Sequence, residues 1–190
     1  RLLVGGEALS VPHIRRALQV LPDTILVNGY GPTENTTFSC CYEIPRDLDS
    51  RAWSIPIGRP IAHSRAILLD AQLQLTPAGA IGEIFVGGDG LARGYRNRPD
   101  ETNRVFVDDP GASTPDRRLY RTGDLGRLRH DGAIEFRGRR DRQLKIRGHR
   151  IEPGEIEAAL SRIPGVGVAS VQCDDDVVRG RSLVAFIVPS

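Results

Sequence analysis

The chain has 190 residues, of which 39% are hydrophobic, and its 26 Lys and Arg residues nearly balance its 24 Asp and Glu residues. This length and apolar content suit one folded domain or parts of two, and they exclude a largely disordered chain. The balance of charge argues against a nucleic-acid surface, so we expect no nucleic-acid partner. Because no signal peptide and no apolar run of roughly 18 residues occurs, we expect neither export nor a membrane partner.

The three cysteines, two of them adjacent at Cys40 and Cys41, form neither a disulfide framework nor a spaced metal motif. Such a pattern is typical of a reducing compartment, and we expect a cytoplasmic location. The chain begins at Arg1, directly in an apolar stretch, and contains no methionine. We therefore expect it to be a piece of a longer polypeptide.

Residues 1–50 follow an α/β pattern. The segment "RLLVGG" predicts a buried strand, and Ser10 stands where it would cap a helix with apolar residues at helical spacing. The segments "TILVNGYG" and "FSCCYEI" predict two further strands. A strand, a helix and a strand in close succession indicate a parallel pair, and we assign residues 1–50 to part of an α/β subdomain.

Residues 51–140 are rich in short strands with polar turns, such as "GEIFVGG" and "GAIEFRGR". This pattern predicts a β-rich, barrel-like subdomain. The dipeptide Asp131–Gly132 is the strongest hairpin signal of the chain. The segment 94–118 is rich in proline and charge, so we expect it to be mostly loop.

Residues 141–190 predict a separate small α+β unit, with its boundary near Asp141. The segment "RQLKIRGHRI" predicts a hairpin with Gly148 at its turn, and "EPGEIEAALSRIPG" predicts a short helix that ends before Gly165. Two more strands, "VASVQCD" and "SLVAFIV", are expected on either side of an acidic turn at residues 174–176.

The stretch "NGYGPTENTTF", residues 28–38, joins two predicted strands, and in isolation a surface turn explains it as well as a binding site does. Tyr30 offers an aromatic face to a flat heterocycle. Thr33 offers a hydroxyl to a phosphate, and Glu34 offers a hard oxygen ligand of the kind that Mg²⁺ accepts. Because ligands of parallel sheets gather outside the carboxyl ends of strands, its position favours a binding site.

Two later motifs also allow alternative interpretations. In "YRTGDL", Asp124 could cap its own backbone turn, which these six residues alone favour, or bind both hydroxyls of a ribose. The segment 138–157 is either a solvated charged hairpin and helix start or a site near an anion, because its many cations repel one another otherwise. These cations are Arg139, Arg140, Arg142, Lys145, Arg147 and Arg150.

Four motifs, taken together and in this order, resemble successive core motifs of the adenylate-forming (ANL) enzymes, and most closely the amino-acid adenylation domains of nonribosomal peptide synthetases. They are "NGYGPTE", "GEIFVGGDGLARGYR", "YRTGDL" and "GRRDRQLKIRGHRIEPGEIE". The resemblance runs from residue 1 to residue 165, and its last motif departs from the usual pattern mainly at Pro153, where relatives often carry leucine. Proline is tolerated at such a helix start. The resemblance implies the ANL fold, in which a large core precedes a small, mobile α+β domain.

The resemblance also implies an activity. Enzymes of this family join an amino-acid carboxylate to the α-phosphate of ATP in the presence of Mg²⁺ and release pyrophosphate. They then pass the aminoacyl group to the phosphopantetheine thiol of a peptidyl carrier protein. A carrier protein domain and a neighbouring condensation domain are therefore implied as partners.

Carried over residue by residue, the resemblance assigns a role to each motif. Asn28 and Tyr30 would hold the adenine, and Gly31 lies in the same nucleotide loop. Thr33 and Glu34 would act on the α-phosphate and on Mg²⁺, respectively. The remaining assignments are the two ribose contacts, Asp124 and Arg139, and the hinge of the small domain, Asp141.

The amino-acid pocket is implied in the same way, by the residues Leu3, Gly5, Gly29, Thr37 and Phe38. Small glycines beside an aromatic and an aliphatic wall make a compact apolar pocket, and the pattern is similar to that of valine-activating domains. Because such a pocket distinguishes one methylene by only ~1–3 kcal/mol, isoleucine or another branched aliphatic residue is expected to be accepted as well.

Three further parts of the family pattern are expected outside these residues. The phosphate loop and the aspartate that binds the substrate amino group should precede residue 1, and the lysine that contacts the substrate carboxylate should follow residue 190. We therefore expect the 190-residue chain alone to be inactive in adenylation. Two alternatives stay open: a standalone acyl- or aryl-acid ligase of the same superfamily, without the upstream aspartate, and a non-catalytic interaction fragment.

Overall fold

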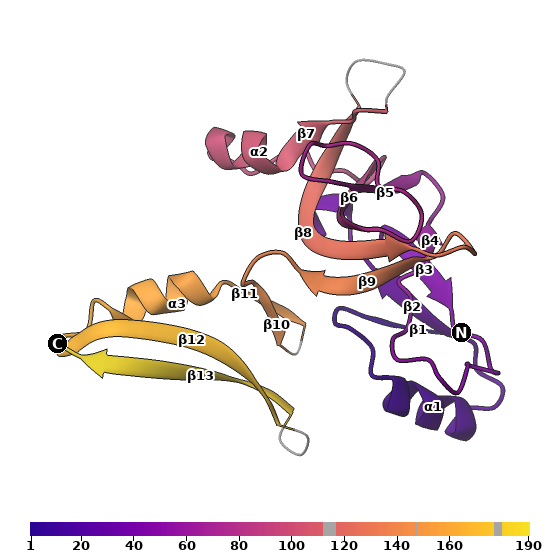
Figure 1. Cartoon of the computed structure of the whole chain (residues 1–190), viewed down its shortest axis with the longest axis horizontal. Helices are drawn as coiled ribbons and strands as arrows, with labels where there is room; N and C mark the ends of the chain where they lie inside the picture. The colour runs from indigo at the N-terminus through magenta and orange to yellow at the C-terminus, as the bar shows by residue number, and fades with distance from the viewer. Residues whose placement is uncertain (112–116, 147, 177–179) are drawn as a thin grey trace. The chain divides into compact units, whose positions relative to one another are not determined.

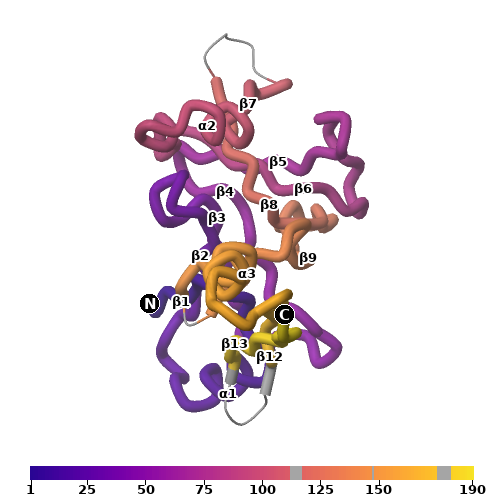
Figure 2. Tube along the Cα trace, turned by 90° about the vertical axis from the view of Figure 1, so that its left-hand side faces the viewer, coloured from indigo at the N-terminus to yellow at the C-terminus, as the bar shows by residue number. Residues whose placement is uncertain are grey.

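The computed structural model describes residues 1–111, 117–146, 148–176 and 180–190. Arg147, one of the predicted run of cations, lies outside the described residues. The chain divides into two compact units, residues 1–140 and residues 141–190, and Figures 1 and 2 trace the elements of each.

The first sheet of the larger unit has four strands in the order β1–β2–β3–β4. Its elements are β1 (Leu2–Gly5), α1 (Val11–Val20), β2 (Leu26–Tyr30), β3 (Cys40–Glu43) and β4 (Arg59–Pro60). The pairing of β1 with β2 is parallel, as the strand–helix–strand pattern predicts, and the other two pairings are antiparallel. Ser10 is the N-cap residue of α1, but its hydroxyl contacts the ring of His13 instead of the helix backbone.

The second sheet of the larger unit has five strands, in the order β5–β6–β8–β7 with β9 paired to β8. Its elements are β5 (Ser64–Leu69), β6 (Ile81–Gly88), α2 (Pro99–Val105), β7 (Phe106–Asp108), β8 (Arg118–Leu128) and β9 (Ile134–Arg139). The hairpin prediction at Asp131–Gly132 is confirmed, because β8 and β9 are antiparallel neighbours and Gly132 has a φ of 78°.

The segment 94–118 contains α2 and β7, so the prediction of a loop was wrong for residues 99–108. Its first proline, Pro99, lies in the first turn of α2, where proline is tolerated. Asp100 and Glu101 follow in the same turn, where acidic side chains suit the positive end of the helix dipole. Phe106 is buried at the start of β7, which pairs with β8.

One apolar core joins the two sheets of the larger unit. Tyr30 and Cys40 of the first sheet pack with Ile84 and Tyr120 of the second. Removal of this apolar surface from water stabilises the packing of the two sheets by ~25 cal/mol per Å². The core therefore brings the end of β2 beside β8, although these strands are far apart in the sequence.

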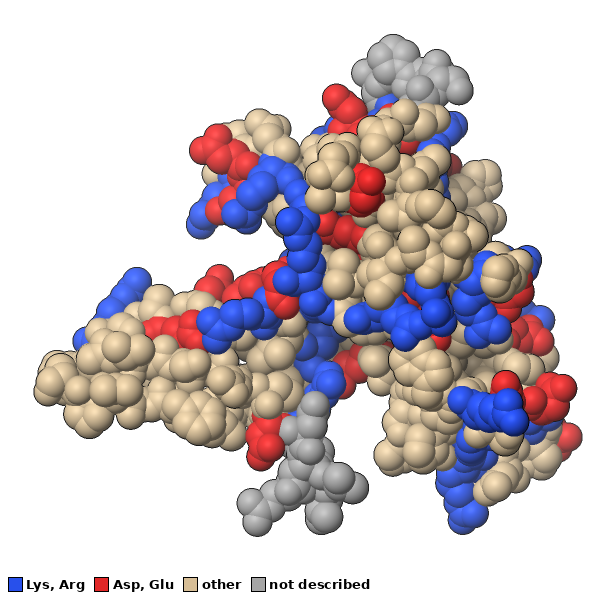
Figure 3. Space-filling model, in the orientation of Figure 1, with Lys and Arg blue, Asp and Glu red and all other residues tan. Residues whose placement is uncertain are grey.

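The smaller unit contains one helix and two antiparallel strand pairs among its described residues. Its elements are β10 (Leu144–Ile146), β11 (His149–Ile151), α3 (Pro153–Leu160), β12 (Val166–Asp176) and β13 (Gly180–Pro189). The hairpin predicted around Gly148 is confirmed, with Ile146 opposite His149, and α3 ends before Gly165 as expected. The hairpin of β12 and β13 shows a largely uncharged surface in Figure 3.

The acidic residues 174–176 belong to β12 and not to a turn, which corrects the prediction. The ladder continues through them, with Asp174 opposite Ser182 and Asp175 opposite Arg181. An antiparallel ladder provides backbone hydrogen bonds to polar residues as well as to apolar ones, so β12 continues beyond its apolar stretch.

None of the helices among the described residues has the length and apolar character of a membrane-spanning segment.

Candidate functional site

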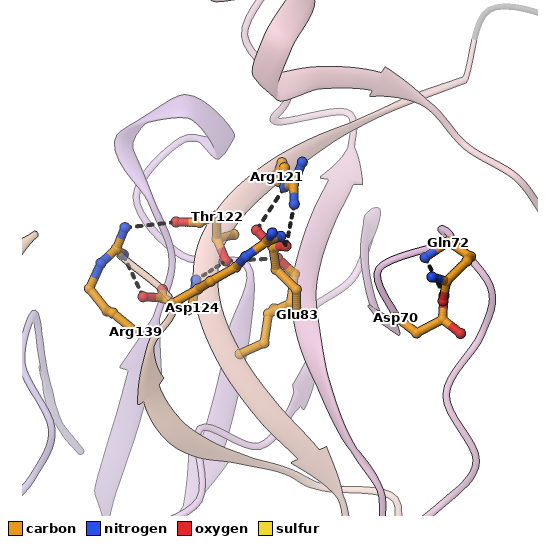
Figure 4. Close-up of polar contacts among 9 residues, drawn as sticks. Asp70, Gln72, Glu83, Arg121, Thr122, Asp124 and Arg139 are labelled. Atoms are coloured by element: carbon orange, nitrogen blue, oxygen red, sulfur yellow. Dashed lines mark hydrogen bonds and ion pairs between the residues drawn. The ribbon is translucent and has the colours of Figure 1, made fainter. Parts of the chain in front are cut away.

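Asp124, in β8, is the centre of a buried polar cluster (Figure 4). Its Oδ2 accepts a hydrogen bond from Tyr30 Oη at 2.6 Å, and its Oδ1 accepts one from Arg139 Nη1 at 2.5 Å. Asp124 is only 4% exposed. A carboxylate offers about four lone-pair positions, of which these donors use two. Two acceptor positions therefore remain, which is the number that a vicinal diol requires.

A strand, and not a turn, holds Asp124 in place. The backbone N–H of Asp124 donates to Thr122 Oγ1 at 3.0 Å, and this hydroxyl donates to the carbonyl of Ile84 at 2.7 Å. The cap in "YRTGDL" is therefore the threonine hydroxyl, and the interpretation of Asp124 as its own cap was wrong. Arg139 also donates to the carbonyl of Thr122 at 3.1 Å, so the backbone of β8 positions this partner of Asp124 as well.

Tyr30 presents its hydroxyl to the cluster from the end of β2. Its ring is 8% exposed and packs in the core that joins the two sheets. Burial raises the pKa of Tyr30 well above its ordinary value, and the charge of Asp124 raises this pKa further. The phenol therefore stays protonated at neutral pH and remains a hydrogen-bond donor to Asp124.

Asn28 and Gly31 shape the backbone on either side of Tyr30. The buried amide of Asn28 donates to the carbonyl of Pro56 at 2.8 Å, which ties β2 to the segment that precedes β4. A Cβ on Gly31 would lie 2.6 Å from the carbonyl oxygen of Thr37. Only glycine fits at this position, because the loop that begins here folds back onto itself.

Thr33 and Glu34 open the short 3-10 helix η1 (Thr33–Asn35). Thr33 is exposed, whereas Glu34 is 7% exposed and its Oε1 accepts a hydrogen bond from Tyr95 Oη at 2.5 Å. The ring of Tyr95 meets that of Phe106 edge to face, with the ring centroids 5.7 Å apart. Burial raises the pKa of Tyr95, and the hydrogen bond to Glu34 raises it further. Tyr95 is thus held as a donor to this carboxylate.

The side chains around Glu34 offer few ligands for a metal ion such as Mg²⁺. Among the residues that the structure describes, no group of three or more His, Cys, Asp or Glu side chains could hold a metal ion. Mg²⁺ is usually bound through one or two carboxylates together with substrate phosphates. A single carboxylate, Glu34, next to the exposed hydroxyl of Thr33 fits this mode, in which the substrate phosphates supply the other ligands.

Four of the five predicted pocket residues lie together around the parallel pair β1–β2. The register places Gly5 opposite Gly29. A Cβ on Gly29 would lie 2.6 Å from Cε1 of Phe38 and 3.1 Å from Cδ1 of Leu3. Both side chains therefore reach the same glycine, and its lack of a side chain makes room for them.

Thr37, the fifth pocket residue, is exposed and has an unusual backbone conformation. Its φ is 70°, and that of Thr36 is 44°, in the left-handed region that non-glycine residues rarely adopt. Such residues cost about 1–3 kcal/mol each and persist only where the surroundings hold them. Here the hydroxyl of Thr36 donates to the carbonyl of Gly90 at 2.6 Å.

Four of the six cations of the predicted run pair with carboxylates of the protein itself. The pairs are Arg139–Asp124, Arg140–Glu83, Arg142–Glu157 and Arg150–Glu152. These partners offset the mutual repulsion without a bound anion. The predicted hinge residue, Asp141, is exposed, and its Oδ1 accepts the backbone N–H of Gln143 at 3.2 Å.

Thr122, Glu83, Arg121 and Tyr95 were not singled out from the sequence. Arg121 donates two hydrogen bonds to Glu83, at 2.9 and 2.8 Å, and these residues stand 38 positions apart. Such pairs leave no local signal, because only the register of β6 against β8 brings them together.

Comparison with known proteins places the chain in a family. The family model described as "AMP-binding enzyme" matches residues 1–96. Tyrocidine synthase 3 of Brevibacillus parabrevis is 51% identical over 188 residues, which cover 99% of this chain and 3% of that protein. Gramicidin S synthase 2 of Brevibacillus brevis is 48% identical over 188 residues, which cover 99% of this chain and 4% of that protein. The chain thus spans only a small part of the length of these relatives.

Solved structures agree with these matches. Holo-PA1221, described as a nonribosomal peptide synthetase protein containing adenylation and PCP domains and bound to a vinylsulfonamide inhibitor, matches with a TM-score of 0.92 at 40% identity. The match covers 100% of this chain and 32% of that one. IdnL1 matches with a TM-score of 0.88 at 32% identity over 99% of this chain and 38% of its own. The predicted resemblance and fold class are confirmed, and the chain spans about a third of these structures.

Proposed function

Because this chain belongs to the AMP-binding enzyme family, we propose that it is part of an amino-acid-activating adenylation domain. Residues 1–50 and 51–140 belong to its α/β and β-rich core subdomains, and residues 141–190 begin its small mobile domain. The complete domain forms an aminoacyl adenylate from ATP and an amino acid, then loads it onto a phosphopantetheine carrier protein. The synthases of tyrocidine and gramicidin S among the relatives, and the PCP domain of PA1221, support a place in nonribosomal peptide synthesis with a carrier protein as partner. A neighbouring condensation domain and a cytoplasmic location are part of the same proposal.

The buried cluster of Tyr30, Asp124 and Arg139 is the observation that carries this proposal. Asp124 keeps two acceptor positions after its two donors are counted, and these suit the 2′ and 3′ hydroxyls of a ribose. The cluster is nearly excluded from water, which strengthens each hydrogen bond in it. Asn28 and Gly31 complete the adenine side of the site.

Thr33 and Glu34 serve the phosphate end of the nucleotide in this proposal. The exposed hydroxyl of Thr33 donates to the α-phosphate, and Glu34, oriented by Tyr95, holds Mg²⁺. When bound, the metal supplies positive charge where the transition state of phosphoryl chemistry spreads negative charge over oxygens.

The substrate is proposed to be valine or another branched aliphatic amino acid. Leu3 and Phe38 meet beside Gly29, and the exposed Thr37 lies next to them in the chain. A small apolar pocket of this kind excludes long and charged side chains better than it separates valine from isoleucine.

Asp141 is proposed as the hinge of the small domain, whose rotation lets one site serve two half-reactions.

Amino-acid-dependent exchange of pyrophosphate into ATP tests the proposed function. The test uses a complete adenylation domain that contains these 190 residues, a panel of amino acids and plain acyl and aryl acids. We expect the strongest stimulation by valine and isoleucine, and no exchange by the 190-residue chain alone. Stimulation by plain acids only would favour the acid ligase alternative. A folded domain without any exchange would favour the interaction fragment and contradict the proposal.

A further inference from the structure

Two consecutive arginines at the end of the larger unit are bound to opposite faces of the second sheet. Arg139 binds Asp124 on the face that carries the joint core. Arg140 Nη1 donates to Oε2 of Glu83 at 3.0 Å on the other face, where Phe85 packs in a separate apolar cluster. In addition, the backbone N–H of Arg140 donates to the carbonyl of Gly123 at 2.8 Å.

Glu83, Arg121 and Arg140 form what we call the Glu83 cluster (Figure 4 labels the first two). The guanidinium of Arg121 by itself reaches both carboxylate oxygens of Glu83, and Arg140 adds a second hydrogen bond to one of them. The side chain of Glu83 is 7% exposed. Burial by itself raises the pKa of Glu83, but the hydrogen bonds and charges of Arg121 and Arg140 outweigh this effect and hold the pKa below its ordinary value. Glu83 is therefore ionised at neutral pH.

Arg140 is not required to neutralise this buried charge, because Arg121 already pairs with both oxygens. The side chain of Arg140 is 55% exposed, and ion pairs with so much solvent contact contribute little to overall stability. What the contact does fix is the chain segment to which Arg140 belongs. This segment lies directly between Arg139, which binds Asp124, and Asp141, where the smaller unit begins.

We propose that Arg140, through Glu83, is a positioning residue that fixes the stationary end of the hinge. With Arg140 held by its side chain and its backbone N–H, motion of the small unit begins at Asp141 and does not displace Arg139 from Asp124. The ribose contacts then stay in place through both half-reactions. This inference rests on the proposed function, since it assumes a mobile unit and a nucleotide at Asp124.

Amide hydrogen exchange of a complete adenylation domain containing these residues tests the anchor directly. We expect Arg140→Ala to speed exchange in peptides covering residues 138–141 by about fivefold, since one partly exposed ion pair is lost. The matched control is Arg129→Ala, which removes another partly exposed pair, Arg129–Asp131, from the β8–β9 hairpin. It should leave residues 138–141 unchanged. Arg140→Lys should restore exchange to within about twofold, because it keeps the charge.

The same variants are assayed for the two half-reactions. Arg140→Ala should raise the KM for ATP about threefold and slow thioester formation more than adenylate formation, whereas Arg129→Ala should change neither. The inference would be overturned if Arg140→Ala kept the wild-type rate of amide exchange at residues 138–141, the wild-type KM for ATP and the wild-type rates of both half-reactions. Faster exchange throughout the larger unit would also overturn it, because the role would then be general stability. If the wild-type domain lacked activity altogether, the proposed function would fail, while the exchange measurement would still decide whether Arg140 anchors the segment.

Discussion

The two units of the chain differ in how completely their side chains are buried. In the larger unit, Asp124 and Glu83 are 4% and 6% exposed and are fixed by partners from several strands. In the smaller unit, the apolar side chains of β13 are largely exposed, including Phe186 at 58% and Val188 at 59%. Only Ile146 and Val171 are large buried hydrophobics among its described residues. The polar clusters of the larger unit are therefore held by packing within that unit, whereas the described side chains of β13 gain little stability from burial.

Paired substitutions of phenylalanine test this contrast with the largest expected effect. Phe85→Ala should lower the free energy of unfolding by about 3–5 kcal/mol, because the ring is fully buried against Leu69 and Leu119. Phe186→Ala should change it by less than about 0.5 kcal/mol, since the ring is exposed. Urea unfolding of each variant measures both values, and equal losses would contradict the contrast.

Gly29→Ala tests whether Gly29 and Phe38 of the larger unit line the proposed amino-acid pocket. The new Cβ would lie 2.6 Å from the Phe38 ring, so this ring must move into the pocket or away from it. Overpacking of this size costs ~1–3 kcal/mol, and the same cost in the complex with valine predicts a loss of about fivefold to 150-fold in kcat/KM for valine-dependent exchange.

Gly154→Ala is the matched control, because Gly154 lies in α3 of the smaller unit and a Cβ there meets open space. It should leave exchange unchanged. Equal activity of the two variants would show that Phe38 and Gly29 do not line the amino-acid pocket.

Tyr30→Phe isolates one hydrogen bond of the Asp124 cluster. It keeps the ring in the core but removes the donor that lies 2.6 Å from Asp124. Hydrogen bonds to charged groups contribute about 1.5–3 kcal/mol, so we expect the KM for ATP to rise about tenfold. Tyr42→Phe, a half-buried position in β3, is the control. A similar KM in both variants would argue that Asp124 needs no orientation by Tyr30.

Acid should lower the free energy of unfolding of the larger unit, and this is the smallest of the expected effects. Burial raises the pKa values of Glu83 and Glu135, but their arginine partners and, for Glu135, Ser54 outweigh it and hold both values below the ordinary 4.5. Stability from such carboxyls is fully present above the unfolded pKa and is lost as the pH falls through the folded pKa. The free energy of unfolding should therefore decline below a pH of about 4.5, and less so in Glu83→Gln. A flat profile down to pH 3 would contradict this.

Short sequence patterns predicted the turns and strand pairs that depend on residues close together in the chain. The hairpin at Gly132, the turn at Gly148 and the parallel pair β1–β2 follow from turn chemistry and apolar periodicity. Tyr30 and Asp124 were found because each stands in a short motif. Their mutual hydrogen bond joins residues 94 positions apart and depends on how two sheets pack, which no local window contains.

The errors have the same origin. Proline and charge in the segment 94–118 fit both a loop and a helix start, and the pairing of β7 with β8 decides between them. Likewise, three aspartates in a row suggest a turn, but the ladder between β12 and β13 continues through them.

Nucleotide binding with and without the ribose hydroxyls tests the central claim most directly. Affinities for AMP and for 2′,3′-dideoxy-AMP are measured by calorimetry with a complete adenylation domain and with its Asp124→Asn variant. Two hydrogen bonds to a carboxylate, at about 1.5–3 kcal/mol each, predict that the wild-type protein binds AMP at least about a hundredfold more tightly than the dideoxy analogue. The variant should lose most of this preference. If Asp124→Asn discriminates between the two nucleotides as strongly as the wild-type protein, Asp124 does not bind the ribose.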